Sequence, residues 1–127
     1  MPIHPFRAAV ESRQFDTIGR LFTDDVVLHS PVAHRPYTGR AVVATIVAAV
    51  ATVLEGFHFE KEISADTTAL MFCATVDGLD IQGCDFIHIR DDGLIDVLTV
   101  MVRPLKAARV FAARMSEAFA NVKPVSN

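Results

Sequence analysis

The sequence has no excess of basic residues, no long apolar run and no paired cysteine motif. Its 127 residues carry a formal net charge of −3, so we expect no nucleic-acid partner, which would require a basic surface. The longest apolar run, Ala41 to Leu54, is shorter than the roughly 20 residues of a membrane-spanning helix. The sequence therefore predicts a protein that acts on neither nucleic acid nor a membrane.

The first residues and the cysteines favour a cytoplasmic location. Residues 1–13 lack the basic segment and following apolar stretch of a secretory signal. Cys73 and Cys84 stand alone, without a Cys-x-x-Cys motif, which is typical of reduced thiols. The five histidines show no HxH or HxxxH pairing, so no metal site and no cofactor is predicted.

The first half of the chain has the spacing of helices. Phe6, Val10 and Arg13 recur at helical intervals, and Asp16 and Thr38 are suitable caps for two further helices. With 51% hydrophobic residues, the chain can bury the core of one domain, residues 1–127. The expected elements of this half are helices at about 6–13, 17–22 and 39–54, with a short strand at 26–30.

The second half changes from a helical period to the alternation of strands. Asp77-Gly78 is a hairpin turn signal, and Asp91-Asp92-Gly93 is a second one. Pro104 begins a last helix with an apolar stripe. Helices followed by hairpin-linked strands indicate an α+β fold with a curved antiparallel sheet. The expected strands are 57–64, 69–77, 79–90 and 95–103.

Asp85 is the most informative residue, because it is the only charge on the apolar face of its predicted strand. Successive side chains of a strand point to opposite faces, so Asp85 shares a face with Ile81 and Ile87. A buried carboxylate is costly unless it is paired, hydrogen-bonded or protonated. Two interpretations stay open: a structural acid bonded to backbone amides or to a hydroxyl such as Ser30 or Thr75, or the polar group of a ligand pocket.

Gly83, two residues before Asp85 on the same face, bears on that choice. A glycine lacks a side chain, and we expect it to leave space beside the carboxyl group. That space favours a pocket, and a dry pocket would raise the pKa of Asp85 and make it a donor or a base near neutral pH.

The segments LFTDDVVLHSPVAHRPYTG, Leu21 to Gly39, and DFIHIRDDGLIDVLTVMVRP, Asp85 to Pro104, resemble the SnoaL-like group of the nuclear transport factor 2-like superfamily. The resemblance implies a cone, in which a bent antiparallel sheet wraps around the N-terminal helices, with a C-terminal helix and an apolar pocket at the open end. It indicates the fold more than the function, because this superfamily contains isomerases, cyclases, hydrolases and non-enzymatic modules.

The resemblance to ketosteroid isomerase covers one of three catalytic groups. Ser30 stands where that enzyme has its basic acid, and Phe6 stands where it has its tyrosine, while Asp85 matches its protonated aspartate. Steroid isomerisation by that mechanism is therefore not expected. Limonene epoxide hydrolase needs an acid near Val100, which is absent. SnoaL-type cyclases use one carboxylate as acid or base, and Asp85 fits that role.

Five further residues are candidates for binding a ligand. Ser30 and Phe6 match pocket positions of the isomerase pattern, and His34 and Tyr37 lie in the loop that borders the pocket mouth in similar proteins. Phe59 is expected to be core or pocket lining. The neighbours His29, His58 and His88 are expected to face away from the pocket.

The outer face of the sheet is expected to be apolar. Phe86 and Cys84 lie on it, together with either Val97-Thr99-Met101 or Leu98-Val100-Val102 of the last strand. Such a patch usually marks an interface, and similar proteins pair through this face, so a homodimer is predicted. Two functions stay open: cofactor-independent acid/base chemistry by Asp85 on an apolar oxygenated molecule, of isomerase, cyclase or lyase type, or non-catalytic binding of a hydrophobic small molecule.

Overall fold

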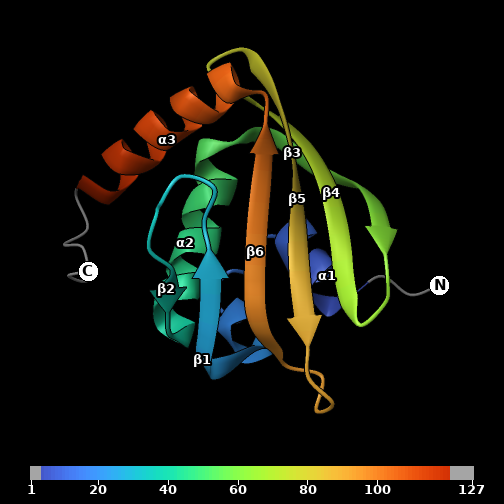
Figure 1. Ribbon diagram of the computed structural model, residues 1–127. Coiled ribbons are helices and arrows are strands. Elements are labelled where there is room, and N and C mark those ends of the chain that lie inside the picture. Colours follow the sequence, from blue (N-terminus) through green and yellow to red (C-terminus); the bar gives the residue numbers. More distant parts are fainter. Residues whose placement is uncertain (1–3, 121–127) are drawn as a thin grey trace.

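The computed structural model describes residues 4–120, which form three α-helices, one 3-10 helix and one sheet (Figure 1). No helix among these residues is long and apolar enough to cross a membrane. The elements in chain order are α1 (Pro5–Glu11), the 3-10 helix η1 (Ile18–Leu21), β1 (Phe22–His29), β2 (Tyr37–Thr38), α2 (Arg40–Val53), β3 (Glu55–Ile63), β4 (Thr67–Val76), β5 (Leu79–Ile89), β6 (Ile95–Arg103) and α3 (Leu105–Ala120).

The strands form one mixed sheet in the order β2-β1-β6-β5-β4-β3. The meander from β3 to β6 is antiparallel, as the hairpin signals predict. Strand β1 pairs with β6 in parallel, which the sequence does not indicate. Parallel neighbours need no tight turn between them, and here β2, α2 and strands β3 to β5 separate the two strands in the chain.

Several elements of the first half differ from the sequence expectation, since α1 ends at Glu11, β1 begins at Phe22, and Tyr37–Thr38 forms β2 within the expected loop. The segment after Asp16 forms a single 3-10 turn, and Phe22 opens strand β1 instead of completing a helical stripe. Helix α2 begins after Gly39, at φ 111°, while Thr38 belongs to β2. Arg40 ties α2 to β1, because its guanidinium Nε and Nη2 donate to the Phe22 carbonyl oxygen at 3.1 and 3.0 Å.

The curved sheet packs one face against the helices, and this face carries the core. Figure 1 shows α1 and α2 behind the sheet, with α3 leaving the end of β6 across one edge. Ile81, Asp85 and Ile87 of β5 are buried, whereas Asp80 and His88 of the same strand are exposed. The alternation predicted around Asp85 is therefore confirmed. The largest fully buried side chains are Phe6, Ile18, Phe22, Val26, Val43, Leu70, Val76, Ile81, Ile87, Ile95 and Leu98.

Candidate functional site

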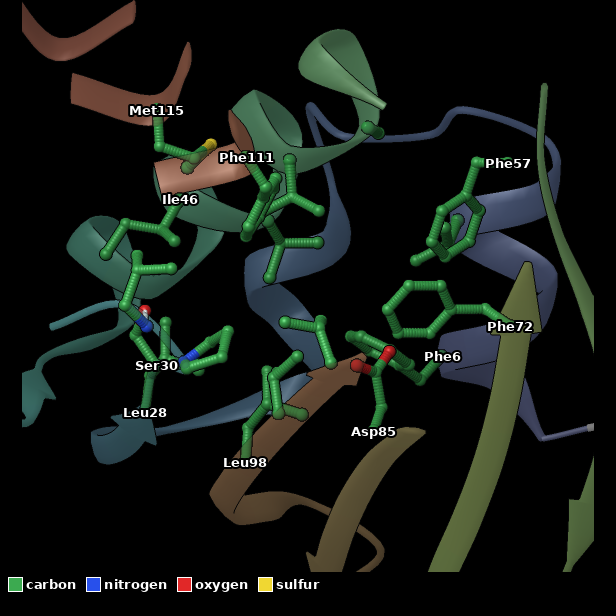
Figure 2. A pocket seen from close by; sticks show the side chains of 18 residues that line it. Phe6, Leu28, Ser30, Ile46, Phe57, Phe72, Asp85, Leu98, Phe111 and Met115 are labelled. Atoms are coloured by element: carbon green, nitrogen blue, oxygen red, sulfur yellow. Dashed lines mark hydrogen bonds between the residues drawn. The ribbon is translucent and has the colours of Figure 1, made fainter. Parts of the chain in front are cut away.

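A cavity of about 50 Å³ lies between the inner face of the sheet and the helices (Figure 2). Helix α1 contributes Phe6, α2 contributes Ile46, and α3 contributes Phe111 and Met115. Only two polar side chains, Ser30 and Asp85, line it. The full lining is Phe6, Val10, Leu28, Ser30, Pro31, Val32, Ile46, Val47, Val50, Ala51, Phe57, Phe72, Asp85, Leu98, Val100, Val102, Phe111 and Met115.

Asp85 is 8% exposed, and its carboxylate points into the space between Phe6 and Phe72 (Figure 2). No group of residues 4–120 forms a hydrogen bond with this carboxylate. The Ser30 hydroxyl instead accepts from the Val32 amide at 3.2 Å. The Thr75 hydroxyl is directed to the Glu55 carbonyl at 3.5 Å, because Thr75 pairs with Asp80 on the outer face. The groups expected to satisfy a structural acid are thus engaged elsewhere.

Burial alone raises the pKa of Asp85 from 3.8 to about 7. An apolar wall disfavours the charged form, and no nearby charge or hydrogen bond opposes that effect. With a pKa of about 7, the neutral and ionised forms of the carboxyl group coexist near neutral pH. The group can then donate a hydrogen bond in one form and accept a proton in the other, as general acid/base catalysis requires.

The space expected above Gly83 is filled by Phe72. A Cβ built on Gly83 would overlap the Phe72 ring and would lie 2.6 Å from the Met101 carbonyl oxygen. The expectation that Gly83 opens room beside Asp85 was therefore wrong. The reason is the register of β4 and β5, which places Phe72 directly opposite Gly83. The Phe72 ring fills the space that a side chain at position 83 would occupy. Gly83 allows the ring to lie flat in the cavity wall.

Three phenylalanines form an aromatic cluster behind this wall. The rings of Phe57 and Phe72 stack at 4.8 Å between centroids, and both line the cavity. Phe59 packs edge-on against Phe57 at 5.0 Å and against Phe72 at 6.5 Å. Phe59 is buried and is not part of the cavity lining. It therefore contacts the site only through the rings of Phe57 and Phe72.

The other candidate residues occupy different places. Ser30 and Phe6 line the cavity, and Ser30 and Asp85 lie at opposite sides of it (Figure 2). Tyr37 lines a neighbouring hollow of about 480 Å³, which shares Ser30 and Met115 with the cavity. His34 is exposed and lines neither space.

Two residues of α3 complete the cavity, and sequence reasoning did not select them as site residues. Phe111 and Met115 belong to the apolar stripe of that helix, which the sequence shows, but a stripe does not reveal whether it meets solid core or open space. The folded position of α3 over the sheet decides this.

The outer face of the sheet carries three histidines, His29, His58 and His88, and an apolar patch. His88 Nδ1 lies 2.6 Å from the Asp96 carboxylate, and His29 pairs with Thr99 of β6. Because Leu98, Val100 and Val102 line the cavity, the outward set of β6 is Val97, Thr99 and Met101. Met101 is 59% exposed. We define the outer apolar patch as Met71, Cys84, Phe86, Val97 and Met101.

Solved structures with this fold include natural and designed proteins. A steroid delta-isomerase from Pseudomonas aeruginosa is 30% identical, with a TM-score of 0.82 over 94% of this chain and 96% of that one. An uncharacterised bacterial protein with a cystatin-like fold from Silicibacter pomeroyi DSS-3 is 26% identical, with a TM-score of 0.88 over 94% and 89%.

A de novo designed protein with a curved β-sheet is 15% identical and aligns with a TM-score of 0.68 over 93% of this chain and 99% of that one. This likeness concerns the fold alone, and function must be argued from the site. No curated protein matches the chain. The model of the SnoaL-like domain matches residues 3–97, and the chain belongs to this SnoaL-like family within the nuclear transport factor 2-like fold.

Proposed function

We propose that the protein binds an apolar, oxygenated small molecule in the cavity and that Asp85 performs acid/base chemistry on it. The observation that carries this proposal is a buried carboxyl group with no hydrogen-bond partner among residues 4–120, in a wall that is otherwise apolar. Desolvating such a group costs free energy in the folded state. Ligand chemistry accounts for its presence, because a carbonyl or hydroxyl oxygen of the ligand would supply the missing partner.

The reaction class that fits one carboxyl group is isomerisation or cyclisation by proton transfer. Ionised Asp85 would take a proton from the carbon next to a ligand carbonyl group, which forms an enolate. Neutral Asp85 would then return the same proton to a different carbon, so that no cofactor is consumed. The steroid delta-isomerase among the similar structures supports this class.

Steroids themselves fit this cavity poorly. Its volume of about 50 Å³ is well below the roughly 300 Å³ of a typical small-molecule pocket. The neighbouring hollow shares Ser30, Val32, Ile46 and Met115 with the cavity. A shift of these side chains would join the two spaces. A small cyclic ketone is therefore the better first probe.

The experiment compares 3-cyclohexenone and a Δ5-3-ketosteroid as probes. Formation of the conjugated enone is followed by its ultraviolet absorbance, with wild type, Asp85→Asn and Asp80→Asn. Asp80→Asn is the matched control, because Asp80 lies on the exposed face of the same strand. We expect turnover by wild type and by Asp80→Asn, and a loss of about 100-fold or more in Asp85→Asn. Equal turnover in all three proteins would contradict the role of Asp85.

A non-catalytic binding module is the second candidate. It is favoured by the absence of a second acid or base from the cavity, where Ser30 replaces the carboxylate of the isomerase pattern. This candidate predicts ketone binding without turnover, with affinity that changes in Asp85→Asn. The variant Ser30→Asp separates the two further, because a new carboxylate at that wall would create turnover in a protein that otherwise only binds.

We also propose that two copies pair through the outer apolar patch in the cytoplasm. Monomers rarely expose a contiguous patch of this kind, and a twofold axis would cover Phe86 and Met101 of both copies. Free Cys73 and Cys84 fit a reducing compartment. Light scattering at micromolar concentration is the test, and a monomer mass would contradict the pairing.

A further inference from the structure

The fold brings three potential metal ligands together on the outer face of the sheet, away from the cavity. His58 and Glu60 both belong to β3, and the contact between their side chains places them on the same side of that strand. Cys73 of β4 is the direct partner of His58 across the strand pair. His58 and Glu60 are exposed and Cys73 is half-buried, so the three side chains are reachable from solvent.

The donor atoms of the three residues are close enough to share one ion. One nitrogen, one oxygen and one sulfur atom lie within 4.8 Å of one another. His58 Nε2 and Glu60 Oε1 are 3.7 Å apart. A tetrahedral zinc ion with ordinary bond lengths places its ligands about 3.4 to 3.6 Å apart. The Glu60 side chain is 45% exposed. It can therefore rotate to bring its carboxylate oxygen to the separation from His58 Nε2 that a zinc ion requires.

Two of the ligands already have the outer hydrogen bonds that metal sites use to orient them. His58 Nδ1 lies 2.9 Å from the Gly56 carbonyl oxygen. A carbonyl only accepts, so Nδ1 carries the proton and Nε2 presents its lone pair to an ion. The amide nitrogen of Gln82 lies 3.6 Å from Cys73 Sγ. The Gln82 side-chain oxygen accepts from Arg103 at 2.6 Å, which fixes the orientation of that amide.

The local charge also favours a cation. The carboxylates of Glu60 and Asp80 lie close enough to Cys73 to act on its sulfur. The surroundings of the sulfur are therefore negative. A divalent cation bound between these groups would offset that negative potential.

We propose that His58, Glu60 and Cys73 form a zinc site with water in the fourth position. The mixed set of imidazole, carboxylate and thiolate is typical of Zn²⁺, whereas Mg²⁺ and Ca²⁺ prefer oxygen ligands alone. Three protein ligands leave one position open to exchangeable water or to a small anion. The site joins edge strand β3 to β4 and is independent of the chemistry proposed for Asp85.

The test is titration of the chelator-treated full chain with Co²⁺, followed by displacement with Zn²⁺. Tetrahedral cobalt bound to thiolate gives a near-ultraviolet sulfur-to-cobalt charge-transfer band and intense visible bands. We expect both, at one ion per chain, and we expect Zn²⁺ to remove them. Cys73→Ser should lose the charge-transfer band, while Cys84→Ser, which changes the other thiol, should keep it.

A second pair of variants tests the histidine. His58→Ala should weaken Co²⁺ binding by about tenfold or more, while His88→Ala, which changes another outer-face histidine, should leave the affinity unchanged. Circular dichroism confirms that each variant is folded. The proposal is overturned if the charge-transfer band is absent from wild type, persists in Cys73→Ser, or disappears equally in Cys84→Ser, and also if the affinity falls equally in both histidine variants.

Discussion

The burial of Asp85 predicts a specific dependence of stability on pH, which Asp85→Asn should remove. The pKa is 3.8 when the group is unburied and about 7 in the folded protein. At about 1.4 kcal/mol for each tenfold change in the proton dissociation constant, this difference corresponds to about 4 kcal/mol. Asparagine keeps the shape of the side chain but carries no charge at any of these pH values.

The sign follows from the direction of the pKa change. The folded state holds its proton more tightly than the unfolded state, so the neutral form makes its full contribution to stability below about pH 4. That contribution is lost as the pH rises towards 7, and the free energy of unfolding falls over this window. Relative to wild type, Asp85→Asn should therefore become more stable as the pH rises, by about 4 kcal/mol in total, and the difference should level off above pH 7.

The assay is urea unfolding of both proteins at a series of pH values from 4 to 8.5, monitored by circular dichroism. Titration of every other group is common to the two proteins, so their difference isolates Asp85. Asp80→Asn is the matched control, because it removes a carboxyl group from the exposed face of the same strand. A difference between Asp85→Asn and wild type that stays constant with pH would refute the argument that the carboxyl group is desolvated.

Three further predictions concern the cavity wall and the outer face. Gly83→Ala should lower the free energy of unfolding by about 1 to 3 kcal/mol, because the new Cβ overlaps the Phe72 ring; an unchanged urea midpoint would contradict this. Met115→Ala should cost about 2 to 5 kcal/mol and should tighten the binding of ketones larger than 3-cyclohexenone, measured by calorimetry, since it enlarges the cavity; weaker binding of those ketones would count against a ligand there. Met101→Glu should shift light scattering from dimer to monomer mass, while Lys106→Glu on α3 should not.

Local rules were sufficient to predict the strands of the meander from β3 to β6 and the direction of Asp85. Alternation with a period of two is a property of the extended backbone, so the buried face of β5 can be read from its own residues. The hairpin signal at Asp77-Gly78 is local as well, and both residues adopt positive φ, 50° and 79°. Counting back from that turn also places Phe72 opposite Gly83. The sequence could therefore have predicted that Phe72 fills the space above Gly83.

Other features depended on contacts between distant segments. No turn connects β1 directly to β6, so no turn signal in the sequence indicates their parallel pairing. Phe111 and Met115 of α3 form part of the cavity wall. The sequence of a helix shows its apolar stripe but does not show which part of the fold that stripe packs against.

The grouping of His58 with Cys73 shows the same limit most clearly. The sequence gives two lone residues, and the histidine spacing by itself predicts no metal site. Strands β3 and β4 pair with two register shifts, one between Glu55 and His58 and one between Phe59 and Lys61. Each bulge inserts an unpaired residue into β3. Counting residues outward from the turn between β3 and β4 therefore does not identify the residues that pair across the two strands. In β5, which runs opposite β4 without a bulge, the sequence determined which face each side chain occupies. In β3 the tertiary structure decided both the face and the partners, since Glu62 lies opposite the buried Leu70 and Ile63 is exposed. The physical reason is that register across a bulged strand pair is set by packing rather than by local backbone preference.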